Sequence, residues 1–356
     1  MYYKRQELSK MSIKEDALKY HAALPHGKIG TNITKPVKTQ ADLSLAYTPG
    51  VAEPCLAIAK DPTMAYQYTN KGNLVAVISN GTAVLGLGNI GALASKPVME
   101  GKALLFKHFA GIDSFDIEVN ETQVDKLVEI ISAISPSFGG INLEDFKAPE
   151  CFEIERRLKE RLNIPVFHDD QHGTAVIVTA GLINALEIQG KKFKDIKIVM
   201  LGAGAASLAT ANFLLEFGIK KEKLFMFDTK GLLHNDRKDL NEYKRPFAVH
   251  DADMTLTNAF KGADVFIGLS APNIVTQDMV KMMANNAIIF ALTNPNPEIL
   301  SSLVHAVRDD IIMATGRSDY PNQVNNALCF PYLFKAALET KVSEISTSMK
   351  KACAKA

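Results

Sequence analysis

One stretch in the second half of the chain constrains the fold most, because a strand, a glycine turn, a helix and another strand follow one another without a break. Residues 196–201 (IKIVML) are apolar, residues 202–207 read GAGAAS, and a helical segment then leads to the apolar run 223–228. Two further apolar runs follow, at residues 263–270 and 287–295. Strands that alternate with helices in this way predict a parallel, doubly wound sheet of the α/β class.

The glycine turn is of the kind that binds a dinucleotide. Gly202 permits a tight turn, Gly204 lets the backbone approach a pyrophosphate, and Ser207 takes the third, small position. The N–H groups that open the next helix can bind the phosphates, and a carboxylate ending the next strand can accept hydrogen bonds from ribose. The predicted cofactor contacts of this unit are Gly202, Gly204, Ala205, Ala206, Ser207 and Asp228.

A second glycine motif, GLGNIG at residues 86–91, fits the dinucleotide pattern more literally, and Asp113 follows it at a similar distance. Its context differs, because the preceding Asn80-Gly81 pair is a hairpin signal and predicts a return strand over residues 82–88. We therefore expect GAGAAS to hold the cofactor and GLGNIG to form a tight turn near the active site.

Four acidic residues follow short apolar runs in the first half of the chain. Glu144 and Asp145 are adjacent in NLEDF, and Asp169 and Asp170 are adjacent in FHDDQHGTA. If both pairs reach one sheet edge, their carboxylates repel one another unless a cation binds there, and Mg²⁺ or Mn²⁺ prefers such oxygen ligands. The spacing alone also permits solvated loop acids, with Asp169 capping a helix that starts at Ala175.

Seven motifs occur in the order typical of one enzyme family. They are AYTPGVAEPC (46–55), GLGNIG followed by PVMEGKALLF (97–106), NLEDF, FHDDQHGTA, GAGAAS, LTNPNPE (292–298) and GRSDYPNQVNNALCFP (316–331). Over about residues 13–340 the chain resembles the short bacterial-type malic enzymes. The resemblance implies metal-dependent oxidative decarboxylation of L-malate to pyruvate and CO₂, with NAD or NADP as oxidant and Mg²⁺ or Mn²⁺ as metal.

This resemblance and the change of rhythm along the chain predict three parts. Residues 1–172 would form an N-terminal α/β malic enzyme domain that carries the substrate, metal and catalytic residues. Residues 173–320 would form the Rossmann-type NAD(P)-binding domain, and residues 321–356 would pack back on the first domain.

The resemblance also assigns roles to matching positions. Tyr47 matches the general acid and Lys102 the general base, and both would contact the substrate. The metal ligands would be Glu144, Asp145 and Asp170, with Asp169 beside them. The remaining matches are Asn294 and Asn326 for the substrate, and Asn294, Thr174 and Ser270 for the cofactor.

The expected chemistry sets a requirement on Lys102. A lysine accepts the C2 hydroxyl proton only when it is neutral, so its pKa should fall from about 10.4 to about 7–8 through burial and a nearby cation. The metal would polarise the C2 oxygen, and Tyr47 would donate a proton to C3 after CO₂ leaves.

Two features depart from the family pattern. Larger malic enzymes carry an arginine for a substrate carboxylate just before the LGLG string, where this chain has Thr82 and Ala83. Asn294, Asn326 and backbone amides are the candidates for binding the C4 carboxylate instead. The chain also ends before many relatives do, so we expect either a short version or a sequence that lacks a further stretch.

The sequence contains opposing signals for the choice of cofactor. Asp228 favours NAD, because a carboxylate would repel the 2′-phosphate of NADP. Lys244 and Arg245 lie about where NADP-using relatives place a cation. We predict NAD use with appreciable tolerance of NADP.

Composition argues against several other classes of protein. The chain has 40 basic and 39 acidic residues with no long basic block, so a nucleic acid is not expected as a partner. No apolar stretch approaches the roughly 18 residues of a membrane span. Four scattered cysteines favour reduced thiols in a cytoplasmic protein.

The resemblance implies a homodimer, in which residues 8–24 could pack on the neighbour.

Alternative activities remain open on sequence grounds. The same residues would serve a malolactic-type conversion of malate to lactate, or oxaloacetate decarboxylation as the main activity. A catalytically inactive nucleotide sensor on the same fold is a further alternative. The presence of Tyr47, Lys102 and all three metal ligands argues against that last alternative.

Overall fold

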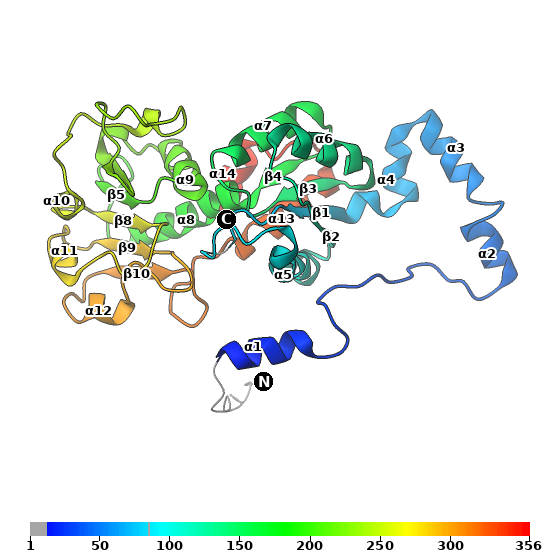
Figure 1. The fold of residues 1–356 in the computed structure, drawn as a ribbon, viewed down its shortest axis with the longest axis horizontal. Coiled ribbons are helices and arrows are strands. Elements are labelled where there is room, and N and C mark those ends of the chain that lie inside the picture. Colours follow the sequence, from blue (N-terminus) through cyan, green and yellow to red (C-terminus); the bar gives the residue numbers. More distant parts are fainter. Residues whose placement is uncertain (1–12, 85) are drawn as a thin grey trace.

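Two sheets organise the protein, and the long helix α8 (Asp169–Ile188) runs from one to the other (Figure 1). The structure, a computed structural model, describes residues 13–84 and 86–356. Within these ranges no helix combines the length and apolar character needed to cross a membrane. The expected α/β class, with a Rossmann-like sheet in the second half, is confirmed.

The first sheet has the strand order β2-β1-β3-β4, and all four strands run parallel. Its strands are β1 (Leu74–Ser79), β2 (Asp113–Glu118), β3 (Gly140–Leu143) and β4 (Val166–His168). One face packs against α5 (Ala92–Ala110), and the other packs against α6 (Val124–Ile134) and α7 (Glu150–Arg161). β1 is buried along its whole length, as its apolar sequence predicts.

The hairpin predicted after β1 is wrong. β2 and β3 occupy both edges of β1, so neither edge is left to pair with a return strand. Asn80 is buried, and Gly81 has φ 68° with its backbone so close to Gly91 that a Cβ would lie 2.2 Å from the Gly91 carbonyl oxygen. Residues 82–91 therefore form a packed loop, in which Leu85 lies outside the described residues.

The second sheet has the strand order β10-β9-β8-β5-β6-β7, and β7 alone runs antiparallel to its neighbour. Its strands are β5 (Ile198–Leu201), β6 (Leu224–Asp228), β7 (Gly231–Leu232), β8 (Val265–Gly268), β9 (Ile288–Ala291) and β10 (Ile312–Thr315). One face packs on α8 and α9 (Ala205–Leu215). The other face packs on α10 (Leu256–Phe260), α11 (Gln277–Lys281) and α12 (Ser301–His305).

Two helices begin earlier than the sequence predicts. α8 begins at Asp169 rather than at Ala175, which places Asp169 and Asp170 in its first turn. The positive end of the helix dipole stabilises carboxylates there. α5 begins at Ala92 and contains Pro97 in its second turn, although the helical spacing of the sequence from Pro97 onward predicts a start at that proline.

The last two helices, α13 (Phe330–Thr340) and α14 (Thr347–Lys355), return to the first sheet. The Phe334 ring lies 5.3 Å from Phe106 of α5 and 5.8 Å from Phe167 of β4, measured between ring centroids. The Phe330 ring lies 4.8 Å from Phe106 in the same way. This aromatic cluster fastens α13 to the first sheet.

An N-terminal arm precedes β1. It contains α1 (Ile13–Ala22), α2 (Gln40–Ala46), α3 (Ala52–Lys60) and α4 (Ala65–Tyr68). α2 and α3 stand away from both sheets (Figure 1), and neither helix has a buried residue. α1 lies within residues 8–24, the segment expected to pack on a neighbour, of which residues 8–12 lie outside the described part of the chain.

Phe334→Ala should lower the free energy of unfolding by about 3–5 kcal/mol, because it empties the centre of a buried aromatic cluster. Urea unfolding monitored by circular dichroism would measure this loss. The matched control is Phe109→Ala on α5. The Phe109 side chain is 40% exposed, so this variant should lower the free energy of unfolding by less than about 1 kcal/mol. Equal losses in the two variants would contradict the anchoring role of α13.

Candidate active site

The carboxyl ends of β3 and β4 lie side by side and deliver the four predicted acids to one place. Glu144 and Asp145 follow β3, and Asp169 and Asp170 open α8 directly after β4. One oxygen from each of Glu144, Asp145 and Asp170 lies within 4.8 Å of the other two. The backbone N–H of Asp145, at φ 57°, donates to Asp170 Oδ2 at 2.8 Å. The three residues predicted as metal ligands therefore converge.

The chemistry of this cluster fits a hard divalent cation. Burial raises the pKa values of Glu144 and of Asp170, because their charged forms lose hydration. Three carboxylates held this close repel one another when all are ionised, and a cation of the Mg²⁺ or Mn²⁺ type relieves that repulsion. The donor set is made of oxygen atoms alone, which is the set such ions prefer.

Lys102 projects from α5 into the same cluster. Its Nζ lies 2.8 Å from Glu144 Oε1 and is paired with Asp169 Oδ2. Burial alone would lower the pKa of Lys102, but the charges of Asp169 and Glu144 outweigh burial and raise it above its ordinary value. The two buried carboxylates that face the amine thus oppose the expected fall in its pKa.

Asp169 is fully enclosed and contacts two predicted substrate residues. Its Oδ2 accepts hydrogen bonds from Lys102 Nζ and, at 2.5 Å, from Asn326 Nδ2. Gly173 leaves room for this carboxylate, because a Cβ there would lie 1.8 Å from Asp169 Oδ1. Burial raises the pKa of Asp169 to about 8. Asp169 thus holds Lys102 and Asn326 together beside the three converging acids.

The GAGAAS turn follows β5 as predicted and leads directly into α9. Gly202 has φ 114°, and a Cβ at this position would lie 2.5 Å from the Leu269 carbonyl oxygen. Ser207 Oγ is buried and has no hydrogen-bond partner among the described residues. Unsatisfied N–H groups at the start of a helix, together with an unpartnered hydroxyl, fit a pyrophosphate.

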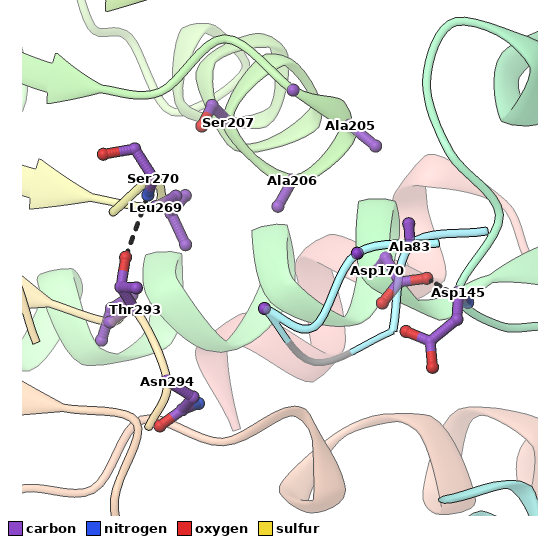
Figure 2. A pocket seen from close by; sticks show the side chains of 14 residues that line it. Ala83, Asp145, Asp170, Ala205, Ala206, Ser207, Leu269, Ser270, Thr293 and Asn294 are labelled. Carbon is purple, nitrogen blue, oxygen red and sulfur yellow. Dashed lines mark hydrogen bonds between the residues drawn. The ribbon is translucent and has the colours of Figure 1, made fainter. Parts of the chain in front are cut away.

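A cleft of about 510 Å³ connects the acids with the glycine turn (Figure 2). It is lined by Ala83, Gly86, Gly88, Asp145, Asp170, Gly204, Ala205, Ala206, Ser207, Leu269, Ser270, Leu292, Thr293 and Asn294. Ser270 and Asn294, both predicted site residues, lie on the wall formed by the ends of β8 and β9. There the Ser270 N–H donates to Thr293 Oγ1 at 3.0 Å. Both glycine motifs and two of the acids thus face one space.

Asp228 ends β6 as predicted, but its carboxylate is already engaged. Arg237 makes two hydrogen bonds to it, at 2.8 and 3.0 Å, and Lys244 Nζ lies 2.8 Å from its Oδ2. Burial would raise the pKa of Asp228, but the hydrogen bonds from Arg237 and Lys244 outweigh burial and lower it to about 2. The carboxylate therefore stays ionised, with its charge balanced by two cations.

Tyr47 and Thr174 are among the predicted residues that do not line the cleft. Tyr47 immediately follows α2 in the N-terminal arm, where it is 70% exposed. Thr174 lies half-buried on α8, one turn after Asp170, and does not line the cleft. Within one chain the structure therefore separates Tyr47 from Lys102 and the acids.

Sequence reasoning missed Arg237, which faces the predicted ribose site. The available signal was the charged string HNDRKDL after β6, in which Arg237 lies nine residues beyond Asp228. Phe330 was also missed as a neighbour of the predicted base, although its ring centre lies 4.0 Å from Lys102 Nζ. Neither contact could be found from spacing, because each joins segments that only the folded chain brings together.

Known families and relatives match most of the chain. The N-terminal domain of malic enzymes matches residues 26–159, and the NAD-binding domain of malic enzymes matches residues 171–356. The NADP-dependent malic enzyme of Haemophilus influenzae is 58% identical over 342 residues, which are 96% of this chain and 45% of that protein. The NAD-dependent malic enzyme of Geobacillus stearothermophilus is 54% identical over 335 residues, which are 93% of this chain and 69% of that protein.

A solved structure agrees with these matches. The malic enzyme from Pyrococcus horikoshii has a TM-score of 0.91 and 46% identity, with 97% of this chain and 83% of that chain covered. The chain spans about half the length of several of the curated relatives it matches. The two family matches and the high identity over nearly the whole chain show that this protein belongs to the malic enzyme family.

Proposed function

We propose that this chain catalyses the metal-dependent oxidative decarboxylation of L-malate to pyruvate and CO₂, with NAD or NADP as the oxidant. The observation that carries the proposal is the shared cleft, which Asp145 and Asp170 line together with the GAGAAS turn. Such a cleft suits a reaction in which a hydroxy acid near a metal gives up hydride to a dinucleotide.

We infer that three consecutive parts of the chain have different binding roles. Residues 1–172 would bind substrate and metal, residues 173–320 would bind the dinucleotide, and residues 321–356 would complete the first part. Support for the last assignment comes from Asn326, which hydrogen-bonds Asp169, and from Phe330, which packs beside Lys102.

Glu144, Asp145 and Asp170 would hold Mg²⁺ or Mn²⁺. When bound, the metal supplies positive charge that polarises the C2 oxygen of malate. Hydrogen bonds within the chain orient two of these carboxylates. Asn142 Nδ2 donates to Glu144 Oε2 at 2.9 Å, and the Asp145 N–H donates to Asp170. Such supporting hydrogen bonds keep metal ligands in a fixed orientation.

Lys102 would accept the proton of the C2 hydroxyl. It is protonated in its present contacts, so it must release a proton before it can act as a base. Asp169 accepts a hydrogen bond from the amine and is placed to take that proton. The hydrogen bond from Asn326 holds the Asp169 carboxylate in this position.

Tyr47 would donate the proton to C3, and we propose that a second copy of the chain supplies it. In its own chain Tyr47 lies on an arm that stands away from the sheets (Figure 1). The arm also exposes the apolar side chains of Leu43, Leu45 and Leu56, which an isolated monomer would leave in water. A homodimer whose arms cross would cover these side chains and carry each Tyr47 to the partner's cleft.

The ion cluster at the end of β6 bears on the choice of dinucleotide. Asp228 alone would repel a 2′-phosphate, but Arg237 and Lys244 already balance its charge. We propose that the chain accepts both NAD and NADP. Arg237 and Lys244 would bind the 2′-phosphate when NADP is the cofactor.

The reaction is tested by supplying L-malate with NAD or NADP and following reduced cofactor and organic products. Pyruvate and net NADH or NADPH should appear with Mg²⁺ or Mn²⁺ and should disappear on chelation by EDTA. Lactate without net NADH would instead establish the malolactic reaction. Pyruvate formed from oxaloacetate but not from malate would establish a simple decarboxylase, and no turnover with intact NADH binding would leave a nucleotide-binding protein.

A variant of one metal ligand separates the metal site from the cofactor site in this assay. Asp170→Asn should lower kcat/KM for malate by roughly 100-fold or more, because a metal supports several kcal/mol of charge stabilisation. The dissociation constant for NADH should stay within about twofold, since α9 and the glycine turn are untouched. Asp278→Asn on α11, whose side chain is 86% exposed, is the control and should change neither quantity.

Arg237→Ala should lower kcat/KM for NADP by roughly tenfold or more and that for NAD by less than about threefold, because only NADP presents a phosphate to the guanidinium. NADPH fluorescence titration should show the same selective weakening. Arg245→Ala removes a neighbouring exposed cation whose guanidinium donates to the Asn235 carbonyl at 3.2 Å, and it should leave the ratio unchanged. Equal losses with both cofactors in Arg237→Ala would show that the ion cluster only supports the fold.

Mixing two inactive variants tests whether Tyr47 acts in the partner. Tyr47→Phe and Lys102→Ala should each abolish malate oxidation. Co-refolding them in equal amounts should restore about a quarter of wild-type activity, because half of the dimers are mixed and each mixed dimer contains one complete site. No recovery in dimers proven to be mixed would place Tyr47 in the site of its own chain.

A further inference from the structure

Two cysteines lie together beside the acid cluster, and the proposed reaction uses neither. Cys329 immediately precedes α13 and Cys353 lies on α14, and their Sγ atoms are 4.0 Å apart. Cys329 is 1% exposed, whereas Cys353 is half-buried. The other cysteines differ, because Cys55 is exposed on the arm and Cys151 is buried on α7.

Cys329 lies between two residues that touch the proposed catalytic groups. Three residues earlier, Asn326 donates to Asp169 at 2.5 Å. The next residue, Phe330, has its ring centre 4.0 Å from Lys102 Nζ. Because these residues belong to one short turn that opens α13, a displacement of Cys329 changes both contacts.

α14 is fastened on the other side of the cysteine pair. Lys351 Nζ lies 2.7 Å from Glu216, which follows α9, and Lys350 Nζ lies 3.3 Å from His172 Nδ1 on α8. Ala354 is buried in the core of the first sheet. Because these contacts hold α14 in place, a bond between the two sulfurs would also pull on the turn at Cys329.

The two thiols of the pair also differ in acidity and in access. The hydrogen bond between the thiols lowers the pKa of Cys353, and together with burial it raises the pKa of Cys329. Cys353 is also the more exposed sulfur, so a small oxidant reaches the better nucleophile first. Its thiolate would attack the terminal oxygen of a hydroperoxide and give a sulfenic acid, while the O–O bond breaks and the other oxygen takes up a proton and leaves as an alcohol or water. The Cys329 thiol would then attack that sulfur, releasing water and forming the disulfide.

We propose that Cys329 and Cys353 form a reversible regulatory disulfide. A hydroperoxide forms this bond and a dithiol reduces it. The bond lowers activity by displacing Asn326 and Phe330. The sulfurs must approach from 4.0 Å to about 2 Å. A displacement of about 1 Å at a catalytic group can cost roughly 100-fold in rate. The effect on activity rests on the proposed function, whereas formation of the bond does not.

The test uses the full chain with Cys55→Ser, which removes the exposed thiol and its intermolecular reactions. After treatment with hydrogen peroxide, peptide mass mapping should show Cys329 and Cys353 in one linked species that dithiothreitol separates. The kcat for malate oxidation should fall at least about tenfold and recover with dithiothreitol. Adding Cys353→Ser should leave kcat near the parent value before and after peroxide.

Several outcomes would overturn the proposal. One is the absence of the linked species under conditions in which peroxide oxidises Cys55 of the unmodified chain. Another is inactivation of the Cys353→Ser variant to the same extent as its parent. A linked species with unchanged kcat would overturn the regulatory role. If no variant oxidises malate before treatment, the proposed function fails, and the linked species alone still decides whether the disulfide exists.

Discussion

The buried ion cluster of Lys102, Asp169 and Glu144 is the interaction on which the rest of the structure depends. All three side chains are removed from water, and they come from α5, from the start of α8 and from the end of β3. Removing one member would leave a buried charge without a partner, which costs several kcal/mol. The cluster therefore fixes where α5 and α8 meet the carboxyl edge of the first sheet, and it places the predicted base among the predicted metal ligands.

α8 extends this constraint from the first sheet to the second. Ala175 and Val176 near its start belong to the core of the first sheet, and Val178 and Leu182 belong to the core of the second. A single rigid helix thus spans both cores without an intervening loop. Its packing against α9 determines how far Asp170 lies from the glycine turn, so both walls of the cleft are positioned by helix packing.

The features that the sequence predicted are those with a local signal. The apolar runs of β5, β6, β8 and β9 and the glycine turn before α9 depend on neighbouring residues, and the structure contains them. The hairpin at Asn80 failed because the edges of β1 are filled by strands far away in the sequence. The two carboxylates beside Lys102 and the pairing of Asp228 with Arg237 were missed for the same reason, since both depend on the groups that folding places around a charge. The location of Tyr47 relative to the cleft depends on the arm, which no local pattern could place.

The two glycine motifs show why a matching pattern does not establish a phosphate site. In GLGNIG, the N–H groups of Ile90 and Gly91 both donate to the Gly81 carbonyl at 3.1 Å, so the loop already uses the donors that a phosphate would need. Gly86 serves a close approach instead, because a Cβ there would lie 2.7 Å from the Asn294 carbonyl oxygen. In GAGAAS the strand runs straight into the turn, and the first N–H groups of α9 have no partner within the helix. The difference lies in which backbone donors remain available, and that is decided by the packing of the loop around Gly81 and not by the spacing of the glycines.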